Sequence, residues 1–129
     1  MFGLGTVTRI MKADGTDPIP VASTNTVYTP VFELHAGEAF GVAMKAVVTS
    51  GTPDVKVELE ESMELPTSEA ADTDMVEPDG FPDVFNLTDQ LVHIKQITPV
   101  PAKYGRFKLT GQGMNPASTT VRIDLFRQE

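Results

Sequence analysis

The stretch Phe40-Gly41-Val42-Ala43-Met44-Lys45-Ala46-Val47-Val48 decides the fold class of this 129-residue chain. Successive side chains of an extended strand point to opposite faces, so residues at every second position share a face. One face of this stretch is wholly apolar and consists of Phe40, Val42, Met44, Ala46 and Val48, whereas the other includes glycine and lysine. The alternation predicts a core strand over residues 39–49.

The same period of two recurs along the chain, whereas helical periodicity is nearly absent. The ten glycines and ten prolines lie mostly between these runs, where turns need them. Short strands with such punctuation predict an all-β fold, namely a single-domain antiparallel β-sandwich or jelly roll. Further strands are expected over residues 6–12, 27–34, 55–60, 91–98, 106–109 and 121–126.

Two pairs of these strands are expected to form hairpins. The connection Ser50-Gly51-Thr52-Pro53-Asp54 has the composition of a turn and joins strands 39–49 and 55–60. The longer segment 111–118 contains two glycines and an Asn-Pro pair, which suits a wider hairpin between strands 106–109 and 121–126.

Two segments stand apart from the regular strands. Residues 1–25 hold one strand candidate followed by Asp14-Gly15-Thr16-Asp17-Pro18-Ile19-Pro20, which predicts an N-terminal arm or edge strand and an extended linker. Residues 26–129 are then the β-sandwich domain. Within this domain, residues 62–82 are interrupted by three prolines and a glycine, and they are expected to form a long acidic loop.

Charge is distributed unevenly along the chain. The formal net charge is −8, which disfavours nucleic-acid binding because such surfaces depend on lysine and arginine. Between Val57 and Ile94 there are eleven acidic residues and no lysine or arginine, while the rest of the chain carries ten basic and seven acidic residues. The acidic middle could attract a basic partner, repel neighbouring copies, or simply keep the chain solvated.

No pattern of catalytic residues stands out. The chain has no cysteine, and its two histidines, His35 and His93, are not accompanied by a G-x-S-x-G nucleophile elbow. The phenylalanines are expected in the core, apart from Phe81 in the acidic loop. Plain solvation is weighed against calcium binding for the carboxylates of Asp72, Asp74, Glu77 and Asp79. We expect no catalytic residue, no cofactor and no metal site.

Nothing in the sequence predicts a membrane segment or a signal peptide. The chain has no apolar run near the roughly 20 residues of a membrane-spanning helix. The first residues also lack the order of a basic region followed by an apolar one. The expectation is a protein that is made and used without secretion.

The last third of the chain carries a more specific pattern. It runs through Thr98-Pro99-Val100-Pro101-Ala102-Lys103-Tyr104-Gly105-Arg106-Phe107-Lys108-Leu109-Thr110-Gly111, then Asn115-Pro116 and Thr119-Thr120-Val121-Arg122-Ile123. A proline-bounded start, an aromatic residue with arginine, a Gly and Asn-Pro loop and a final alternating strand follow one another. This order resembles small β-sandwich proteins of tailed bacteriophages that are virion structural components, notably capsid decoration or auxiliary proteins.

The resemblance implies a non-enzymatic structural protein of the virion, foremost a capsid decoration or cement protein on the capsid surface, made in the host cytoplasm. Its partners would be the major capsid protein or other virion subunits, and further copies of the chain in a dimer or trimer, with no nucleic acid and no membrane. An arm that adds as a strand to a neighbour needs only main-chain groups. The residues expected to contact partners are Phe2, Leu4, Val7 and Ile10 in the arm, and Met75 and Phe81 in the acidic loop. A lectin-like or adhesive binding module is the alternative function.

Overall fold

The computed structural model describes residues 5–34, 38–63, 75, 84–97, 102–113 and 119–128. All regular elements of these residues are strands, and none of the described residues is helical. The strands are β1 (Gly5–Ile10), β2 (Ile19–Pro20), β3 (Thr26–Tyr28), β4 (Phe32–Glu33), β5 (Phe40–Val47), β6 (Val55–Ser62), β7 (Phe85–Leu87), β8 (His93–Ile97), β9 (Tyr104–Gly111) and β10 (Thr120–Gln128).

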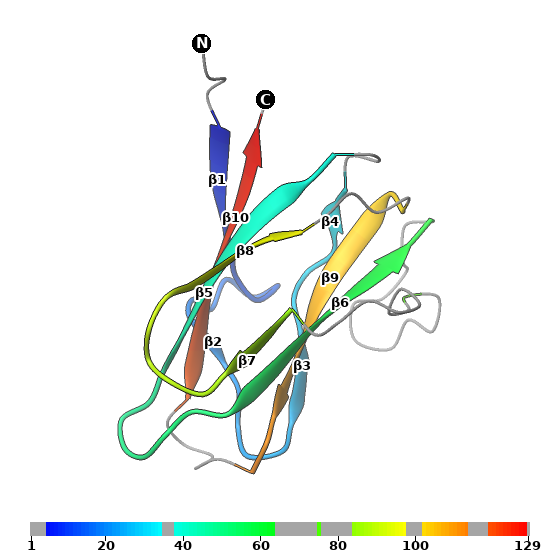
Figure 1. Ribbon diagram of the computed structural model, residues 1–129. Helices are drawn as coiled ribbons and strands as arrows, with labels where there is room; N and C mark the ends of the chain where they lie inside the picture. The colour runs from blue at the N-terminus through cyan, green and yellow to red at the C-terminus, as the bar shows by residue number, and fades with distance from the viewer. Residues whose placement is uncertain are drawn as a thin grey trace.

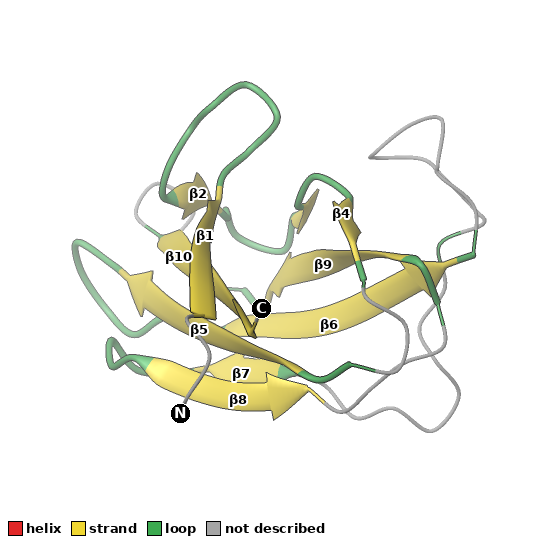
Figure 2. Cartoon of the chain, turned by 90° about the horizontal axis from the view of Figure 1, so that it is seen from above, coloured by secondary structure: helices red, strands yellow, loops and turns green. Residues whose placement is uncertain are grey.

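The strands form two antiparallel sheets, one packed on the other (Figures 1 and 2). Sheet A has the order β1-β10-β5-β8, and β2 pairs with β10 beyond the end of β1. Sheet B has the order β3-β9-β6-β7, and β4 pairs with β9 beside β3. The prediction of an all-β antiparallel sandwich is confirmed.

The core lies between the facing sides of the two sheets. The predicted apolar face of β5 is buried there, since Val42, Met44 and Ala46 are at most 1% exposed. Sheet B supplies the opposite layer with Leu59, Phe107 and other side chains of β6 and β9. Alternation along each strand therefore places apolar residues inward and the remaining residues on an outer face.

Both predicted hairpins are wrong. Strand β5 pairs with β10 and β8 in sheet A, whereas β6 pairs with β9 and β7 in sheet B. Likewise, β9 belongs to sheet B and β10 to sheet A. The turn-like segments 48–54 and 112–119 therefore connect the two layers. A sandwich buries both inner faces when consecutive strands cross between its sheets, and alternation alone does not reveal a strand's partner.

The predicted strand 27–34 is divided into β3 and β4 around Thr29 and Pro30. Thr29 is fully buried and replaces the regular ladder with its own hydrogen bonds to β9. Its Oγ1 accepts from the Phe107 N–H at 2.9 Å, and its N–H donates to the Phe107 carbonyl at 3.0 Å. Proline has no N–H to donate to a neighbouring strand, which accounts for the break.

Residues 5–25 contribute to sheet A and to the core. All six residues of β1 pair with β10, from Gly5 opposite Gln128 to Ile10 opposite Ile123. Within the segment predicted as a linker, Ile19 is fully buried, and Val21 just beyond it is 1% exposed. Figure 1 shows β1 and the end of β10 side by side at the same end of the sandwich.

Candidate interaction surface

A groove lies on the outer face of sheet A. It encloses about 300 Å³ between strands β5, β8 and β10. Its shape is that of an open groove on a sheet and not of an enclosed cavity. The lining residues are Ala43, Met44, Lys45, Val92, Ile94, Arg122, Asp124 and Phe126.

The strand register explains why a groove forms there. Ala43 of the central strand β5 lies between Asp124 of β10 and Ile94 of β8. Because its side chain is a single methyl group, the larger side chains on both neighbours stand above it. At the next outward position of β5, Phe126 packs against Gly41, where a Cβ would lie 3.5 Å from the Phe126 Cβ. The small side chain of Ala43 on the middle strand thus becomes the floor of the groove.

Apolar side chains beside this floor are left in solvent. Ile94 is 73% exposed and Val92 is 58% exposed. On the far side of β10, Val7 of β1 is 62% exposed and lies opposite Phe126 in the register. Exposed apolar surface gathered on one face marks a site of interaction in soluble proteins.

A small ion-pair cluster borders the groove. Both carboxylate oxygens of Asp124 are engaged, by Arg9 Nε at 2.6 Å and by Arg122 Nε at 3.3 Å. Arg9 also reaches Asp17 at 3.0 Å, and the hydrogen bond that Arg9 donates to Asp124 is the main cause of the raised pKa of Arg9. Lys45, in contrast, makes no ion pair within the described part of the chain. The groove therefore places the ammonium group of Lys45 beside apolar side chains.

Among the described residues, sheet A has two outermost strands. β8 ends the sheet next to β5, and β1 ends it next to β10. An edge strand presents main-chain N–H and C=O groups that another strand can pair with. The groove and the β8 edge adjoin each other, so one partner could contact both.

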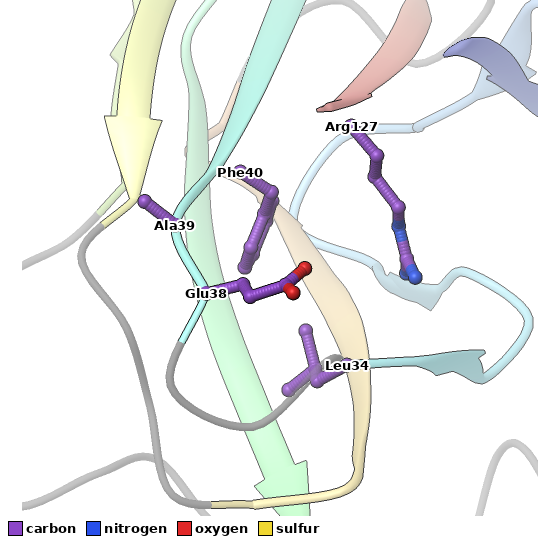
Figure 3. A pocket seen from close by; sticks show the side chains of 5 residues that line it. All are labelled: Leu34, Glu38, Ala39, Phe40 and Arg127. Carbon is purple, nitrogen blue, oxygen red and sulfur yellow. The ribbon is translucent and has the colours of Figure 1, made fainter. Parts of the chain in front are cut away.

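A second, much smaller depression lies near the end of β10 and contains about 10 Å³, which is room for roughly one water molecule. Figure 3 shows the side chains of Glu38 and Arg127 directed toward the same space, beside Phe40 and Leu34. Arg127 donates a hydrogen bond to the Glu33 carbonyl, and burial lowers the pKa of its guanidinium. The hydrogen bond from Arg127 links β10 to β4. The depression itself is too small for a ligand.

The residues predicted to contact partners are placed very differently. Val7 is 62% exposed, whereas Ile10 is 7% exposed and is part of the core cluster. Met75 is 4% exposed. Among these three, Val7 alone offers most of its side chain to a partner. Phe2, Leu4 and Phe81 lie outside the described residues.

The candidate chemical residues give no assembled site in the described ranges. His93 Nε2 lies 2.8 Å from Asp89 Oδ1, and this hydrogen bond is the main reason that the pKa of Asp89 is lowered. His35 and the proposed calcium ligands lie outside the described ranges. Within those ranges, no group of three His, Cys, Asp or Glu residues is placed to hold a metal, and no helix could cross a membrane.

Sequence reasoning missed the groove, although one signal for it was present. The alternation of the last strand sets Phe126 with Arg122 and Asp124, opposite the core face. Phe126 is only partly buried and lies on the outer face of sheet A, so its assignment to the core is wrong. The depth of the groove could not be predicted, because it depends on which strands flank Ala43.

Comparisons with known proteins give no family for this chain. No family model matches the sequence, and no curated protein matches it. Three solved structures are similar in fold at low identity, and they are β-rich chains. The first is the structure of infectious bursal disease virus, Gx strain, with a TM-score of 0.39 and 10% identity over 98% of this chain and 33% of that chain.

The other two neighbours are bacterial or environmental. The K3 cleaved adhesin domain of Lys-gingipain from Porphyromonas gingivalis W83 has a TM-score of 0.41 and 13% identity, covering 95% of this chain and 71% of that one. A family 35 carbohydrate-binding module from an environmental isolate has a TM-score of 0.39 and 14% identity, covering 99% and 96%. This chain thus spans about a third of the viral chain's length, and the likenesses concern the β-rich fold alone.

Proposed function

We propose that this chain is a non-enzymatic structural protein of a tailed-bacteriophage virion, and that it acts as a capsid decoration protein. In this role it binds the major capsid protein or other virion subunits on the capsid surface and stabilises the head through protein contacts alone. It needs neither a cofactor nor a metal for this task.

The observation that carries the proposal is the nature of the groove on sheet A. Enzyme pockets bring titratable groups together around a reacting atom. The groove on sheet A instead combines exposed Ile94 and Val92 with a small-residue floor, and its one carboxylate, Asp124, is already paired with two arginines. Such a surface suits docking against another protein.

Two further features support an assembly role. The described residues form a small sandwich in which β1 and β8 are the outermost strands of sheet A, and strands in that position can accept strand addition. The sequence pattern over residues 98–123 also resembles decoration and auxiliary proteins of tailed phages. Arg106 in that pattern is 2% exposed, so there it serves the fold and not a binding surface.

A pelleting assay tests the proposal. Purified chain is mixed with expanded heads of tailed phages that lack a decoration protein, and the heads are sedimented. The chain should sediment with heads of its own phage at a fixed ratio to capsid subunits, and it should raise the temperature at which those heads open. Ile94→Asp should lower the bound amount, whereas Met11→Asp, which changes another exposed apolar residue, should not.

The alternative binding-module function predicts a different outcome. A lectin-like protein would bind glycans on an array and would stay in the supernatant with every head offered. Strong glycan binding without head binding would overturn the decoration proposal, and so would turnover of a substrate by the purified chain.

A further inference from the structure

The outermost strands of the two sheets differ in how their edges are protected. Natural proteins guard an edge with a short strand, a proline or a lysine, because unpaired main-chain groups otherwise accept another strand. β3, β4 and β7 are only two or three residues long, β2 contains Pro20, and β8 has Lys95 at its centre. β1 is six residues long, and its first four residues, Gly5-Thr6-Val7-Thr8, include no charge and no proline. Among the described strands, β1 therefore has the least protected edge.

This part of β1 is open to solvent on both of its faces. Thr6, Val7 and Thr8 are all exposed, and Val7 is 62% exposed. β1 lies on the far side of β10 from β5, so its other edge points away from the sheet (Figure 1). The guanidinium group of Arg9 is held by its own chain, since it pairs with Asp124. β1 thus offers a partner a strand edge together with the side chains above and below it.

The order of residues in β1 matches itself in an antiparallel pair. Directly opposite residues of such a pair point to the same face, so a strand that pairs with its own copy about a two-fold axis places one residue opposite itself. With Val7 on the axis, Thr6 lies opposite Thr8 of the other copy, and the valines lie opposite each other. Threonine pairs and apolar pairs of this kind are favourable. Arg9 then lies opposite Gly5, so that no like charges meet.

The neighbouring registers are less favourable. With the axis on Thr8, Val7 would lie opposite Arg9, which sets an apolar side chain against a charge. With the axis on Arg9, the two guanidinium groups would lie opposite each other, and like charges in that position are destabilising. With the axis on Thr6, Val7 would lie opposite Gly5 and the apolar pair would be lost. The residue types of β1 therefore select Val7 as the centre.

The same register joins apolar surface on the outer face of sheet A. Val7 lies opposite Phe126 of β10 within the chain. A second copy paired through β1 would therefore continue the row as Phe126, Val7, Val7 and Phe126. An apolar row that crosses the contact removes exposed apolar surface from water in both copies. The partner that fits this edge on both its main chain and its side chains is the chain itself.

We infer that β1 binds β1 of a second copy of this chain, antiparallel and with Val7 on the two-fold axis, so that sheet A continues through both molecules. A two-fold contact uses the same surface on each copy, so assembly through β1 stops at two. β8 lies at the opposite end of sheet A, and its edge stays accessible in this dimer. The inference concerns copies of the chain alone and stands apart from the capsid proposal.

Single cysteine variants test the register, because the chain has no cysteine of its own. A disulfide needs Cα atoms within about 7 Å of each other, and directly opposite residues lie about 4.5–5.5 Å apart. Mild oxidation should therefore convert Val7→Cys to a covalent dimer. Thr6→Cys and Thr8→Cys should crosslink slowly alone and rapidly when mixed, since they face each other across the axis. Met11→Cys, at another exposed apolar residue, is the control and should stay monomeric.

Charge reversal across the axis tests the contact without a covalent bond. Sedimentation velocity over a wide range of concentration should show dimers of the wild type and no larger species. Val7→Lys and Val7→Asp should each weaken dimerisation by about tenfold or more, because each places like charges opposite each other. An equal mixture of the two variants should dimerise again, since opposite charges then meet. Met11→Lys adds the same charge elsewhere and should associate as the wild type does, and thermal melts should show every variant folded.

Three results would overturn the inference. The first is a wild type that stays monomeric at every concentration. The second is a Val7→Cys variant that crosslinks no faster than Met11→Cys, which would show that Val7 does not lie on an axis. The third is a dimer that both charge variants leave unchanged. Failure of the pelleting assay with phage heads would leave these results untouched, so the two proposals fail separately.

Discussion

The outer faces of the two sheets carry similar charged residues and use them in different ways. On sheet B, Arg106 has a side chain only 3% exposed, donates from Nε to Glu60 at 2.8 Å, and lies 4.0 Å above the Tyr28 ring. On sheet A, the Arg122 side chain is 54% exposed, and Ile94, which lines the same groove, is 73% exposed. Sheet B buries its arginine to hold its own strands, whereas sheet A leaves its arginine and several apolar side chains exposed to solvent.

The comparison teaches that similar side chains contribute differently to stability according to their burial. Buried and mutually paired groups are costly to remove, because each leaves an unpaired partner behind. Exposed groups change the free energy of unfolding little, although they can decide whether a partner binds. Substitutions on sheet B should therefore act on folding, and those on sheet A on association.

The largest effect is expected at Arg106. Arg106→Ala leaves the Glu60 carboxylate without its partner and removes the contact with Tyr28, so it should lower the free energy of unfolding by about 3–5 kcal/mol. The matched change on sheet A, Arg122→Ala, should cost at most about 1 kcal/mol, since the pair is exposed. Urea denaturation of both variants measures the difference. Equal losses would break the distinction between the two faces.

A smaller loss is expected at Tyr28. Tyr28→Leu removes the ring under the Arg106 guanidinium and should cost about 1–2 kcal/mol, the range of a partly desolvated cation–π contact. Tyr28→Phe keeps the ring and serves as the control, with a much smaller change. The same urea titration checks both variants. A Phe variant as unstable as the Leu variant would assign the effect to the hydroxyl group instead.

Glu61 differs from the paired charged residues of sheet B. Its Oε2 is buried and has no hydrogen-bond partner among the described residues. Burial raises the pKa of Glu61 above its ordinary 4.5, so the folded state holds the proton more tightly than the unfolded state does. The ionised form therefore destabilises the fold, and stability should rise as the pH falls from the raised pKa toward 4.5.

Glu61→Gln tests this reasoning. The variant should melt at a higher temperature than the wild type at neutral pH, by less than Arg106→Ala lowers it, and the advantage should shrink as the pH approaches 4.5. Thermal melts across a pH series give both results. A glutamine variant that melts lower at neutral pH would show that the carboxylate is stabilised by a partner.

The smallest effect on folding is expected on sheet A. Ile94→Ser should change the free energy of unfolding by no more than about 0.5 kcal/mol, because the side chain is 73% exposed. Denaturation at a concentration where the chain is monomeric isolates folding from association. A loss above 1 kcal/mol, on the order of a partly buried contact, would show that Ile94 supports the sandwich itself.

The faces of the long strands could be predicted well from the sequence. Val42, Met44 and Ala46 on β5, and Val121, Ile123 and Leu125 on β10, are buried as their alternation predicted. The short strands β2 and β7 were missed. Strands of two or three residues show too little alternation to be recognised, and they exist because a long neighbour, β10 or β6, supplies the hydrogen bonds.

The groove could not be predicted in the same way. Its walls, Ile94 and Phe126, come from strands that are distant in sequence from the floor residue Ala43. The expected hairpins would also have placed β5 beside β6, and no such groove would follow from that pairing. Only the observed register brings a methyl group between two long side chains.

The sequence by itself determined that the chain forms amphipathic strands, which face of each is buried, and how charge is spread along it. These properties depend on residues one or two positions apart, which the two-residue period of a strand links directly. The tertiary structure alone decided which strands are neighbours, that Arg106 is held inside sheet B while Arg122, although paired with Asp124, stays exposed, and that Ala43 floors a groove. Strand pairing depends on burying the inner apolar faces of both sheets at the same time. That burial involves residues from the whole length of the chain.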